Sequence, residues 1–343
     1  MIQVQDVNLG KGSFKKGLSD IYSRHDKDSV FWIIDDSIKK KIKNHIPNSN
    51  ILFLEINHEP STNQVNEIVN LIKQNKKEIH CLGIIGGGSV IDIGKAVSVM
   101  LTNNGDAKDF QGWNIPKIPG VTKIIFPSLA GTGAEATRSA VLNSSEKKQG
   151  INSDFCLADA VYLDSFLTSS VPKEIEFFSG MDCYIHAVES LHGSFGNKVT
   201  RAYASSAKAL CENYFLNSSK DKEDLLAASF LAGTAIMNSE VGITHVLSYG
   251  LSFLFGIPHG KANAIIFSKL KDVYGKPVDN FKKMLKINSI KLPNKISKSF
   301  TEKDILKMYQ IGRKMEKPLK HSLGKNWKKN FSKEFAFKIY KSI

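Results

Sequence analysis

The chain has 343 residues, of which 42% are hydrophobic and 23% are charged. This length is sufficient for two domains with buried cores, and the composition excludes a largely disordered protein. The net charge of +14 would suit a nucleic-acid partner, but the lysines are spread along helices expected to face solvent and lack interleaved aromatic residues. No nucleic-acid partner is therefore expected.

The cysteines and the most apolar segments bear on where the protein works. The four cysteines show no C-x-x-C spacing, and no charged segment followed by an apolar one opens the chain. The most apolar long stretch, residues 241–258, contains His245, Ser248 and Tyr249, which favours a buried helix over a membrane span. We therefore expect a cytoplasmic protein with no membrane partner.

The first half of the chain alternates β-rich runs with helical patterns. Strands are predicted at residues 30–34, 51–56, 81–85, 122–126 and 160–163, and helices at residues 63–74 and 90–101. Such alternation predicts an α/β domain, in which a parallel sheet carries helices on both faces.

Helical periodicity replaces the β-rich runs after residue 171. Helices are predicted within residues 202–215, 224–237, 243–255 and 304–315, while the lysine-rich stretch 269–303, with Pro277 and Pro293, gives no clear pattern. Pro172 and the polar residues before it suit a turn into the first helix. We therefore predict an α/β domain over residues 1–168 and an all-helical, metal-binding domain over residues 169–343.

A glycine-rich turn, Gly86 to Ser89, lies between a predicted strand and a predicted helix. Glycines there let backbone N–H groups approach a pyrophosphate, and the helix N-terminus favours negative charge. The alternative is a tight turn that needs only flexibility. The spacing is not that of the G-x-G-x-x-G fingerprint, because the next glycine is Gly94.

Two further features fit a dinucleotide. Asp35 and Asp36 close the first predicted strand, where a carboxylate accepts hydrogen bonds from a ribose and repels a 2′-phosphate, which favours NAD over NADP. A second turn of small residues, 127–135, follows another strand. Its Ser128 and Thr132 hydroxyls are candidates to hold the phosphate or nicotinamide portion.

Four residues predict a metal site. Asp182 and His186 are four positions apart and share one face of a predicted helix, and His245 and His259 are 14 positions apart. One carboxylate and three imidazoles suit Fe²⁺ or Zn²⁺, and the set is typical of a catalytic site. The alternative is a group of separate core histidines that bond to the backbone.

Four ordered segments resemble the diagnostic motifs of the iron-containing alcohol dehydrogenase family: GGGSVIDIGKAVS, PSLAGTGAEAT, VPKEIEFFSGMDCYIHAVES and THVLSYGLSFLFGIPHGKANA. The resemblance implies the dehydroquinate synthase-like fold of this family, with a metal in the cleft between the two domains, and commonly a homodimer. The implied metal ligands are Asp182, His186, His245 and His259. The implied cofactor contacts are Asp36, Gly87, Gly88, Ser89, Ser128, Thr132 and Lys148, and Asp92 and Lys95 would organise the glycine-rich turn.

Within that family, several segments are similar to the 3-deoxy-α-D-manno-octulosonate 8-oxidase group: EPSTNQV, LTNNGDAKDFQGW, GTGAEATRSAVL, KKQGINSDF and GMDCYIHAVESLHG. Tyr249 stands where many family members carry another histidine, and this replacement is also similar to that group. The likeness implies oxidation of the terminal C8 alcohol of an acidic sugar to an aldehyde, in biosynthesis of the 8-amino sugar of lipopolysaccharide. Either NAD or dioxygen would accept the electrons.

Arg138 is the candidate to bind the substrate carboxylate, because guanidinium groups bind carboxylates with two hydrogen bonds; a structural salt bridge is the alternative. Three other functions stay open: an NAD-dependent dehydrogenase of another small or sugar alcohol, a dehydroquinate synthase-like lyase and a catalytically silent binding protein. Histidines outside the motifs are expected at the surface, in loops or, for His192, at a helix end: His25, His45, His58, His80, His192 and His321.

Overall fold

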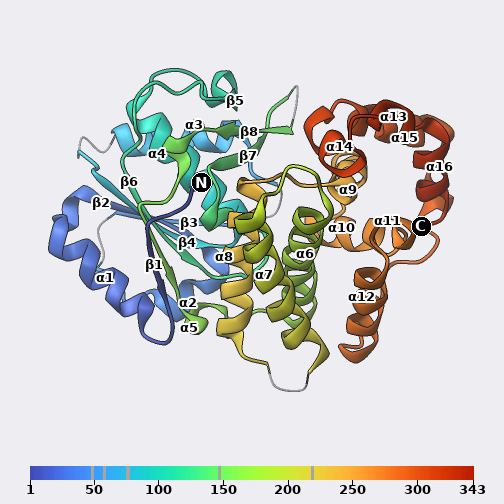
Figure 1. Ribbon diagram of the computed structural model, residues 1–343. Helices are drawn as coiled ribbons and strands as arrows, with labels where there is room; N and C mark the ends of the chain where they lie inside the picture. The colour runs from blue at the N-terminus through green and yellow to red at the C-terminus, as the bar shows by residue number, and fades with distance from the viewer. Residues whose placement is uncertain (48–49, 57–58, 75–77, 146–147, 218–219) are drawn as a thin grey trace. The chain divides into compact units, whose positions relative to one another are not determined.

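The computed structural model describes residues 1–47, 50–56, 59–74, 78–145, 148–217 and 220–343 (Figure 1). The chain divides into two compact units, one of residues 2–171 and the other of residues 172–343 with Met1. The division falls three residues after the predicted one. His58 lies outside the described residues.

The first unit is built on a six-stranded parallel sheet, which confirms the predicted fold class. In spatial order its strands are β1 (Asp6–Leu9), β9 (Ala160–Leu163), β6 (Thr122–Pro127), β4 (Cys81–Gly86), β2 (Val30–Asp35) and β3 (Ile51–Leu54). Every residue of β4 is buried, as expected for a central parallel strand that is covered on both faces.

Helices cover both faces of this sheet. On one face, Trp32 and Phe126 pack with Phe14 and Leu18 of α1 (Ser13–Arg24) and with the short α2 (Lys39–Ile42). On the other face, α4 (Gly88–Thr102) approaches so closely that a Cβ on its Gly94 would lie 2.6 Å from Ile84 Cδ1. The remaining α-helices among the described residues of this unit are α3 (Thr62–Gln74) and α5 (Ser165–Thr168).

A second, three-stranded sheet in this unit was not predicted. Its order is β5 (Gly112–Trp113), β8 (Lys148–Asn152) and β7 (Ser139–Asn143). Strands β7 and β8 pair in antiparallel fashion, whereas β5 pairs with β8 in parallel.

The second unit is helical. Its longest helices, α6 (Lys173–His192), α7 (Lys198–Leu216) and α8 (Lys222–Met237), lie side by side and pack against one another (Figure 1). Helices α9 (Ile243–Phe255) and α10 (His259–Phe267) also pack on α6. Among the described residues, no helix combines the length and the hydropathy needed to cross a membrane.

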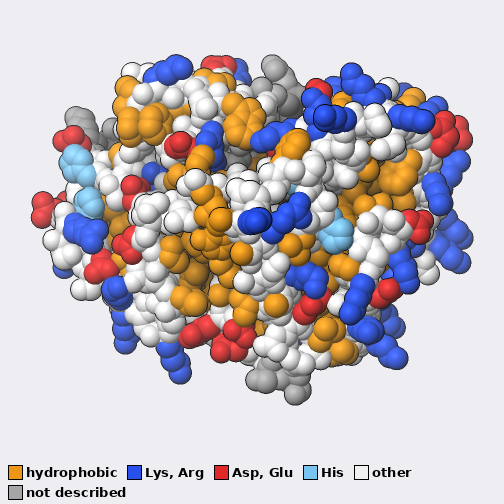
Figure 2. Space-filling view, in the orientation of Figure 1, with side chains coloured by type: hydrophobic (Ala, Val, Ile, Leu, Met, Phe, Trp, Pro, Cys, Tyr) orange, Lys and Arg blue, Asp and Glu red, His pale blue; other side chains and the backbone are white. Residues whose placement is uncertain are grey.

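The rest of the second unit consists of short helices with a strongly basic composition: α11 (Lys271–Tyr274), α12 (Lys276–Ile287), α13 (Glu302–Arg313), α14 (Glu316–Leu323), α15 (Trp327–Asn330) and α16 (Lys333–Lys341). Residues 269–343 contain 21 Lys and Arg but six Asp and Glu, a net charge of +15. The other 268 residues therefore have a net charge of −1. Figure 2 shows basic side chains gathered over these helices.

Candidate metal centre and nucleotide turn

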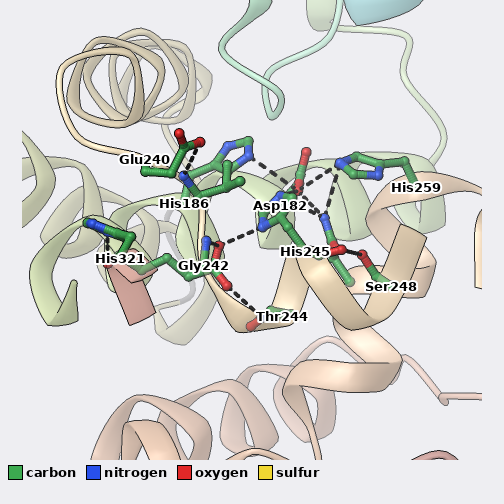
Figure 3. A network of polar contacts seen from close by, with 12 residues as sticks. Asp182, His186, Glu240, Gly242, Thr244, His245, Ser248, His259 and His321 are labelled. Carbon is green, nitrogen blue, oxygen red and sulfur yellow. Dashed lines mark hydrogen bonds and ion pairs between the residues drawn. The ribbon is translucent and has the colours of Figure 1, made fainter. Parts of the chain in front are cut away.

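The predicted metal ligands come together inside the helical unit (Figure 3). Asp182 Oδ1 lies 3.8 Å from Nε2 of His186, 3.4 Å from Nε2 of His245 and 3.7 Å from Nε2 of His259. Two donor atoms that each bind one ion at about 2.1 Å with tetrahedral angles are about 3.4 Å apart. The spacings from Asp182 to each histidine are close to this value, and the donor atoms of Asp182, His186 and His245 form one compact group that could hold a small cation.

The fourth predicted ligand, His259, differs from the other three in its surroundings. The donor atoms of Asp182, His186 and His245 all lie within 4.8 Å of one another, and these residues are buried. The His259 side chain is 27% exposed and begins α10, directly after Pro258. The centre is thus closed by α6 and α9 and most accessible beside His259, which suits a catalytic site more than a structural one.

The electrostatics of the centre prepare it for a cation. Burial alone would raise the pKa of Asp182, but the neighbouring histidine rings outweigh it and hold the pKa well below its ordinary value. Burial lowers the pKa of His186 to about 4, so its ring is neutral at pH 7. Among the described residues, Asp182 Oδ2 is a buried oxygen with no hydrogen-bond partner. A bound divalent ion would supply that missing partner.

Asn263 and Ser248 complete the centre, and neither was predicted. The Asn263 amide donates to Asp182 Oδ1 at 2.6 Å and lies 3.1 Å from His245 Nε2. The Ser248 hydroxyl in turn donates to Asn263 Oδ1. Helical spacing was the available signal, because Ser248 follows His245 by three positions and Asn263 follows His259 by four.

Glu189 is a further buried residue that the motifs left without a role. It lies three positions after His186, on the same face of α6, and its Oε2 lies 2.6 Å from His245 Nδ1. Burial would raise the pKa of Glu189, but His245 and backbone donors hold this pKa at about 2. The Glu189 carboxylate in turn raises the pKa of His245. A proton and a cation therefore compete for His245, and metal binding should weaken as the pH falls.

The prediction for His321 was wrong. This residue is on α14 and only 1% exposed, and its ring accepts a hydrogen bond from the Phe195 N–H and donates one to the Glu189 carbonyl. It fits because Gly193 has no side chain, since a Cβ there would lie 1.7 Å from His321 Nε2. His45 and His80 are exposed and His25 is half-buried, while His192 ends α6 as expected.

The buried His321 should make the fold sensitive to acid. Burial lowers the pKa of His321 below the ordinary value of 6.5, so below that pH the unfolded chain takes up a proton that the folded chain resists. Stability should therefore fall as the pH drops from 7.5 to 5.5. Thermal unfolding of His321→Gln should show a lower midpoint at every pH but a shallower decline than the wild type. The exposed His80→Gln is the control and should keep the wild-type slope.

The glycine-rich turn connects β4 to α4, as predicted. Gly86 ends β4 and Gly88 begins α4, and both are required by packing, because a Cβ would lie 2.4 Å from Val90 Cβ at the first and 2.6 Å from Thr132 Oγ1 at the second. Gly87 is different. Its φ of −80° suits any residue, and a Cβ there would meet Leu129 only at ordinary contact distances of 3.4 and 3.5 Å. Neither packing nor the backbone conformation therefore requires a glycine at this position.

The second small-residue turn lies beside the first. The Ser128 N–H donates to the Gly86 carbonyl at 2.9 Å, and Thr132 lies against Gly88. Lys95 of α4 is fully buried and donates to the Ala134 carbonyl at 2.8 Å. Lys95 therefore supports the segment that follows the second turn, and its predicted role at the glycine-rich turn stays a prediction.

Two other residues predicted to contact the cofactor have defined partners in the first unit. Asp36 follows β2, at the same edge of the sheet as the glycine-rich turn, and lies 3.6 Å from Lys39 Nζ. Lys148 begins β8 and pairs with Glu59 at 2.6 Å.

Arg138 has the contacts of a structural salt bridge. Its guanidinium bonds to Asp154 at 2.6 Å and to Asn114 at 2.9 Å, and it lies over the Trp113 ring. Because both terminal nitrogens are engaged, Arg138 is a weaker candidate for the substrate carboxylate than the sequence implied.

Comparison with known proteins identifies the family. Residues 5–165 match the model for iron-containing alcohol dehydrogenase, and residues 177–326 match the C-terminal model of the Fe-containing alcohol dehydrogenase family. The two models together cover most of the chain, which belongs to the iron-containing alcohol dehydrogenase family, a family of oxidoreductases. The family predicted from the four ordered motifs is thereby confirmed.

Similar proteins in this family carry different names. Sulfoacetaldehyde reductase of Bilophila wadsworthia is 29% identical over 76% of this chain and 70% of its own length. Long-chain-alcohol dehydrogenase 1 of Geobacillus thermodenitrificans is 32% identical over 53% of this chain and 48% of its own length. 4-hydroxybutyrate dehydrogenase of Clostridium kluyveri is 31% identical over 63% of this chain and 60% of its own length. The chain thus spans between about half and 70% of the length of these curated relatives.

Solved structures extend the likeness to nearly the whole chain. Alcohol dehydrogenase of Oenococcus oeni has a TM-score of 0.83 at 20% identity and covers 99% of this chain with 98% of its own. Sulfoacetaldehyde reductase of Bifidobacterium kashiwanohense, solved in complex with NAD⁺, has a TM-score of 0.81 at 20% identity, with coverages of 99% and 96%. At these identities the likeness establishes the fold.

Proposed function

We propose that this chain oxidises a terminal primary alcohol of a small acidic sugar to an aldehyde, and that its substrate is the C8 alcohol of 3-deoxy-α-D-manno-octulosonate. The product would serve biosynthesis of the 8-amino sugar of lipopolysaccharide, in the cytoplasm, and the enzyme would act as a homodimer. The observation that carries the proposal is the convergence of Asp182, His186, His245 and His259 on one small volume.

The residues of the centre fit a divalent ion, either Fe²⁺ or Zn²⁺. When bound, such an ion lowers the pKa of an alcohol and stabilises the negative charge that develops on its oxygen. Asp182 contributes the negative charge, and the neutral His186 contributes a lone pair. The Tyr249 ring lies 5.9 Å from the His259 ring, at the accessible side of the centre. Its hydroxyl is a candidate to hold the proton released by the alcohol.

The electron acceptor is proposed to be NAD, held by the glycine-rich turn. Gly87 supports this choice, since neither packing nor backbone conformation requires a glycine there. The balanced reaction is RCH₂OH + NAD⁺ → RCHO + NADH + H⁺. With dioxygen as the acceptor, the same alcohol would give RCHO and H₂O₂.

The octulosonate is favoured by sequence segments that lie outside the general family motifs, and by Tyr249 at a position where many members have histidine. A second candidate is an NAD-dependent dehydrogenase of a shorter anionic alcohol. It is favoured by two relatives whose names, sulfoacetaldehyde reductase and 4-hydroxybutyrate dehydrogenase, denote small substrates with an anionic group. Family membership disfavours the lyase, and the intact ligand set disfavours a silent binding protein.

One assay separates the candidates. The purified chain, loaded with Fe²⁺ or Zn²⁺, is given either the octulosonate or 4-hydroxybutyrate, with NAD under nitrogen or with dioxygen alone. We expect aldehyde from the octulosonate with kcat/KM at least about 100-fold above that for 4-hydroxybutyrate, a difference of about 2.7 kcal/mol. Aldehyde is trapped as a hydrazone, NADH is followed by absorbance and dioxygen by an electrode.

The proposal fails if only the shorter acid is oxidised, which would support the second candidate. It also fails if activity survives complete removal of divalent metal by a chelator. Light scattering after size exclusion tests the proposed homodimer separately.

A further inference from the structure

We propose that Glu189 is a positioning residue of the metal centre, which holds the His245 ring with Nδ1–H toward its own carboxylate and Nε2 toward Asp182, and which supplies the second buried negative charge. This inference rests on the metal-dependent function proposed above. It concerns a residue that contacts a ligand and not the ion itself. Figure 3 shows the polar network around His245, with Asp182, Gly242 and Thr244 close by.

The Glu189 carboxylate is buried and saturated with donors. Oε2 accepts from the Gly242 N–H at 2.6 Å and lies 2.6 Å from His245 Nδ1. Oε1 accepts from the Thr244 N–H at 2.8 Å and from the Tyr274 hydroxyl at 3.1 Å. Four donors from α9, its N-cap and α11 therefore fix the position of one carboxylate that α6 carries.

This arrangement decides which nitrogen of His245 carries a proton. An ionised carboxylate only accepts hydrogen bonds, so His245 Nδ1, at 2.6 Å, must be the donor. The neutral ring then has its lone pair on Nε2, which faces Asp182 Oδ1 at 3.4 Å. Without the carboxylate, the proton could move to Nε2 and bond to Asp182. That hydrogen bond would occupy two of the four ligand atoms that a cation needs, His245 Nε2 and Asp182 Oδ1.

Glu189 also anchors the helix that carries His245. The N-cap of α9 is Gly242, which has no side chain, and the Glu189 carboxylate binds the free N–H groups of the first turn instead. The close approach requires glycine, since a Cβ on Gly242 would lie 2.9 Å from Glu189 Cδ. Because His245 is the third residue of α9, one carboxylate sets both the position of the helix start and the orientation of the ring.

The charge of Glu189 suits a divalent ion. Among the described residues, no lysine or arginine forms an ion pair with Glu189; its charged partner is His245. With Asp182, the centre therefore holds two buried negative charges. An isolated buried charge is costly, and a cation bound to the far side of the His245 ring offsets it. The two carboxylates together match the charge of a divalent ion.

The test compares metal affinity in three full-length proteins: the wild type, Glu189→Gln and Glu176→Gln. Glu176 is the matched control, because it lies on the same helix and its carboxylate accepts from the Tyr214 hydroxyl at 2.9 Å, away from the metal ligands. Each chain is titrated with Co²⁺ alone, and the visible absorption of the bound ion reports affinity and ligand environment. We expect Glu189→Gln to bind 10- to 100-fold more weakly with an altered spectrum, the usual effect of losing such a partner. Glu176→Gln should match the wild type.

The outcomes separate this inference from the function on which it rests. A wild type that binds no Co²⁺ would defeat the metal-dependent function itself. If the wild type binds Co²⁺ and the affinity of Glu189→Gln lies within about threefold of it, only the positioning role of Glu189 is overturned. Glu189 would then only cap the helix, and its loss would lower thermal stability but not metal affinity.

A measurement on the wild type keeps the test decisive if Glu189→Gln does not fold. In the Zn²⁺-loaded chain with ¹⁵N-labelled histidine, the His245 ring, assigned by its loss in His245→Asn, should show a proton on Nδ1 and none on Nε2. A proton on Nε2 would refute the proposed positioning role.

Discussion

Replacing Asp182 with asparagine should abolish both metal binding and alcohol oxidation. The substitution keeps the shape of the side chain but removes its negative charge. The Nε2 atoms of His186, His245 and His259 all lie within 3.8 Å of this carboxylate. Charge stabilisation at a reacting centre is commonly worth 10²- to 10³-fold per group, so kcat/KM should fall by at least about 10³-fold when the ion is lost too. Metal content by mass spectrometry and initial rates on the octulosonate measure the two effects.

The control for this variant is Asp272→Asn, an exposed aspartate on α11 of the same unit. It should keep wild-type metal content and rate. If Asp182→Asn retained a full equivalent of metal and more than about a tenth of the activity, the four-residue centre would not be the active site.

Replacing Gly87 with alanine should weaken cofactor binding without harming the fold. The structure leaves room for the methyl group, so the unfolding midpoint should stay within about 2 °C of the wild type. If the N–H groups of this turn hold a pyrophosphate, however, the same methyl group stands in the path of the ligand. We expect the Kd for NAD to rise about tenfold or more, which corresponds to about 1.4 kcal/mol. Isothermal titration with NAD measures it.

The neighbouring glycine provides the contrast. In Gly88→Ala the new Cβ would press on Thr132, and overpacking of this kind typically costs 1–3 kcal/mol of stability. This variant should therefore lose both stability and cofactor affinity. Unchanged NAD affinity in Gly87→Ala would show that the turn does not bind the cofactor.

The parallel sheet was predictable because buried strands leave an unmistakable pattern. Strands β2 and β4 are almost wholly apolar and are followed by turns of polar or small residues. Both strands can therefore be predicted from their local sequence alone. The small sheet was not predictable in this way. Strand β8 reads KQGIN, and β5 has two residues, so β8 is a strand only through its pairing with β7, and β5 only through its pairing with β8.

Helix α12 shows how a correct rule can mislead. Pro277 argued against regular structure in the lysine-rich stretch, yet it lies in the first turn of this helix, where proline is well tolerated because the N–H has no partner to lose. The alternation of buried and charged residues that follows it could have been found.

That the predicted metal ligands lie close together could be predicted from their spacing, whereas the residues that hold them in place could not. Asp182 and His186 share a helix face, and Glu189 lies further along the same face. The spacing therefore placed Glu189 near the ligands, but a glutamate in a helix is also typical of a solvent-exposed position. His321 could not have been placed, since its burial depends on a glycine more than 100 residues away in the chain. Long-range contacts of this kind leave no local pattern.

The centre joins two distant stretches of the chain, since His186 and His245 are 59 positions apart. An ion held by both would act as a cross-link that exists only in the folded protein. By mass action, free metal at 100 times its dissociation constant adds about 2.7 kcal/mol to the free energy of unfolding. The supply of iron or zinc in a cell would then govern how long each molecule survives proteolysis as well as how fast it works.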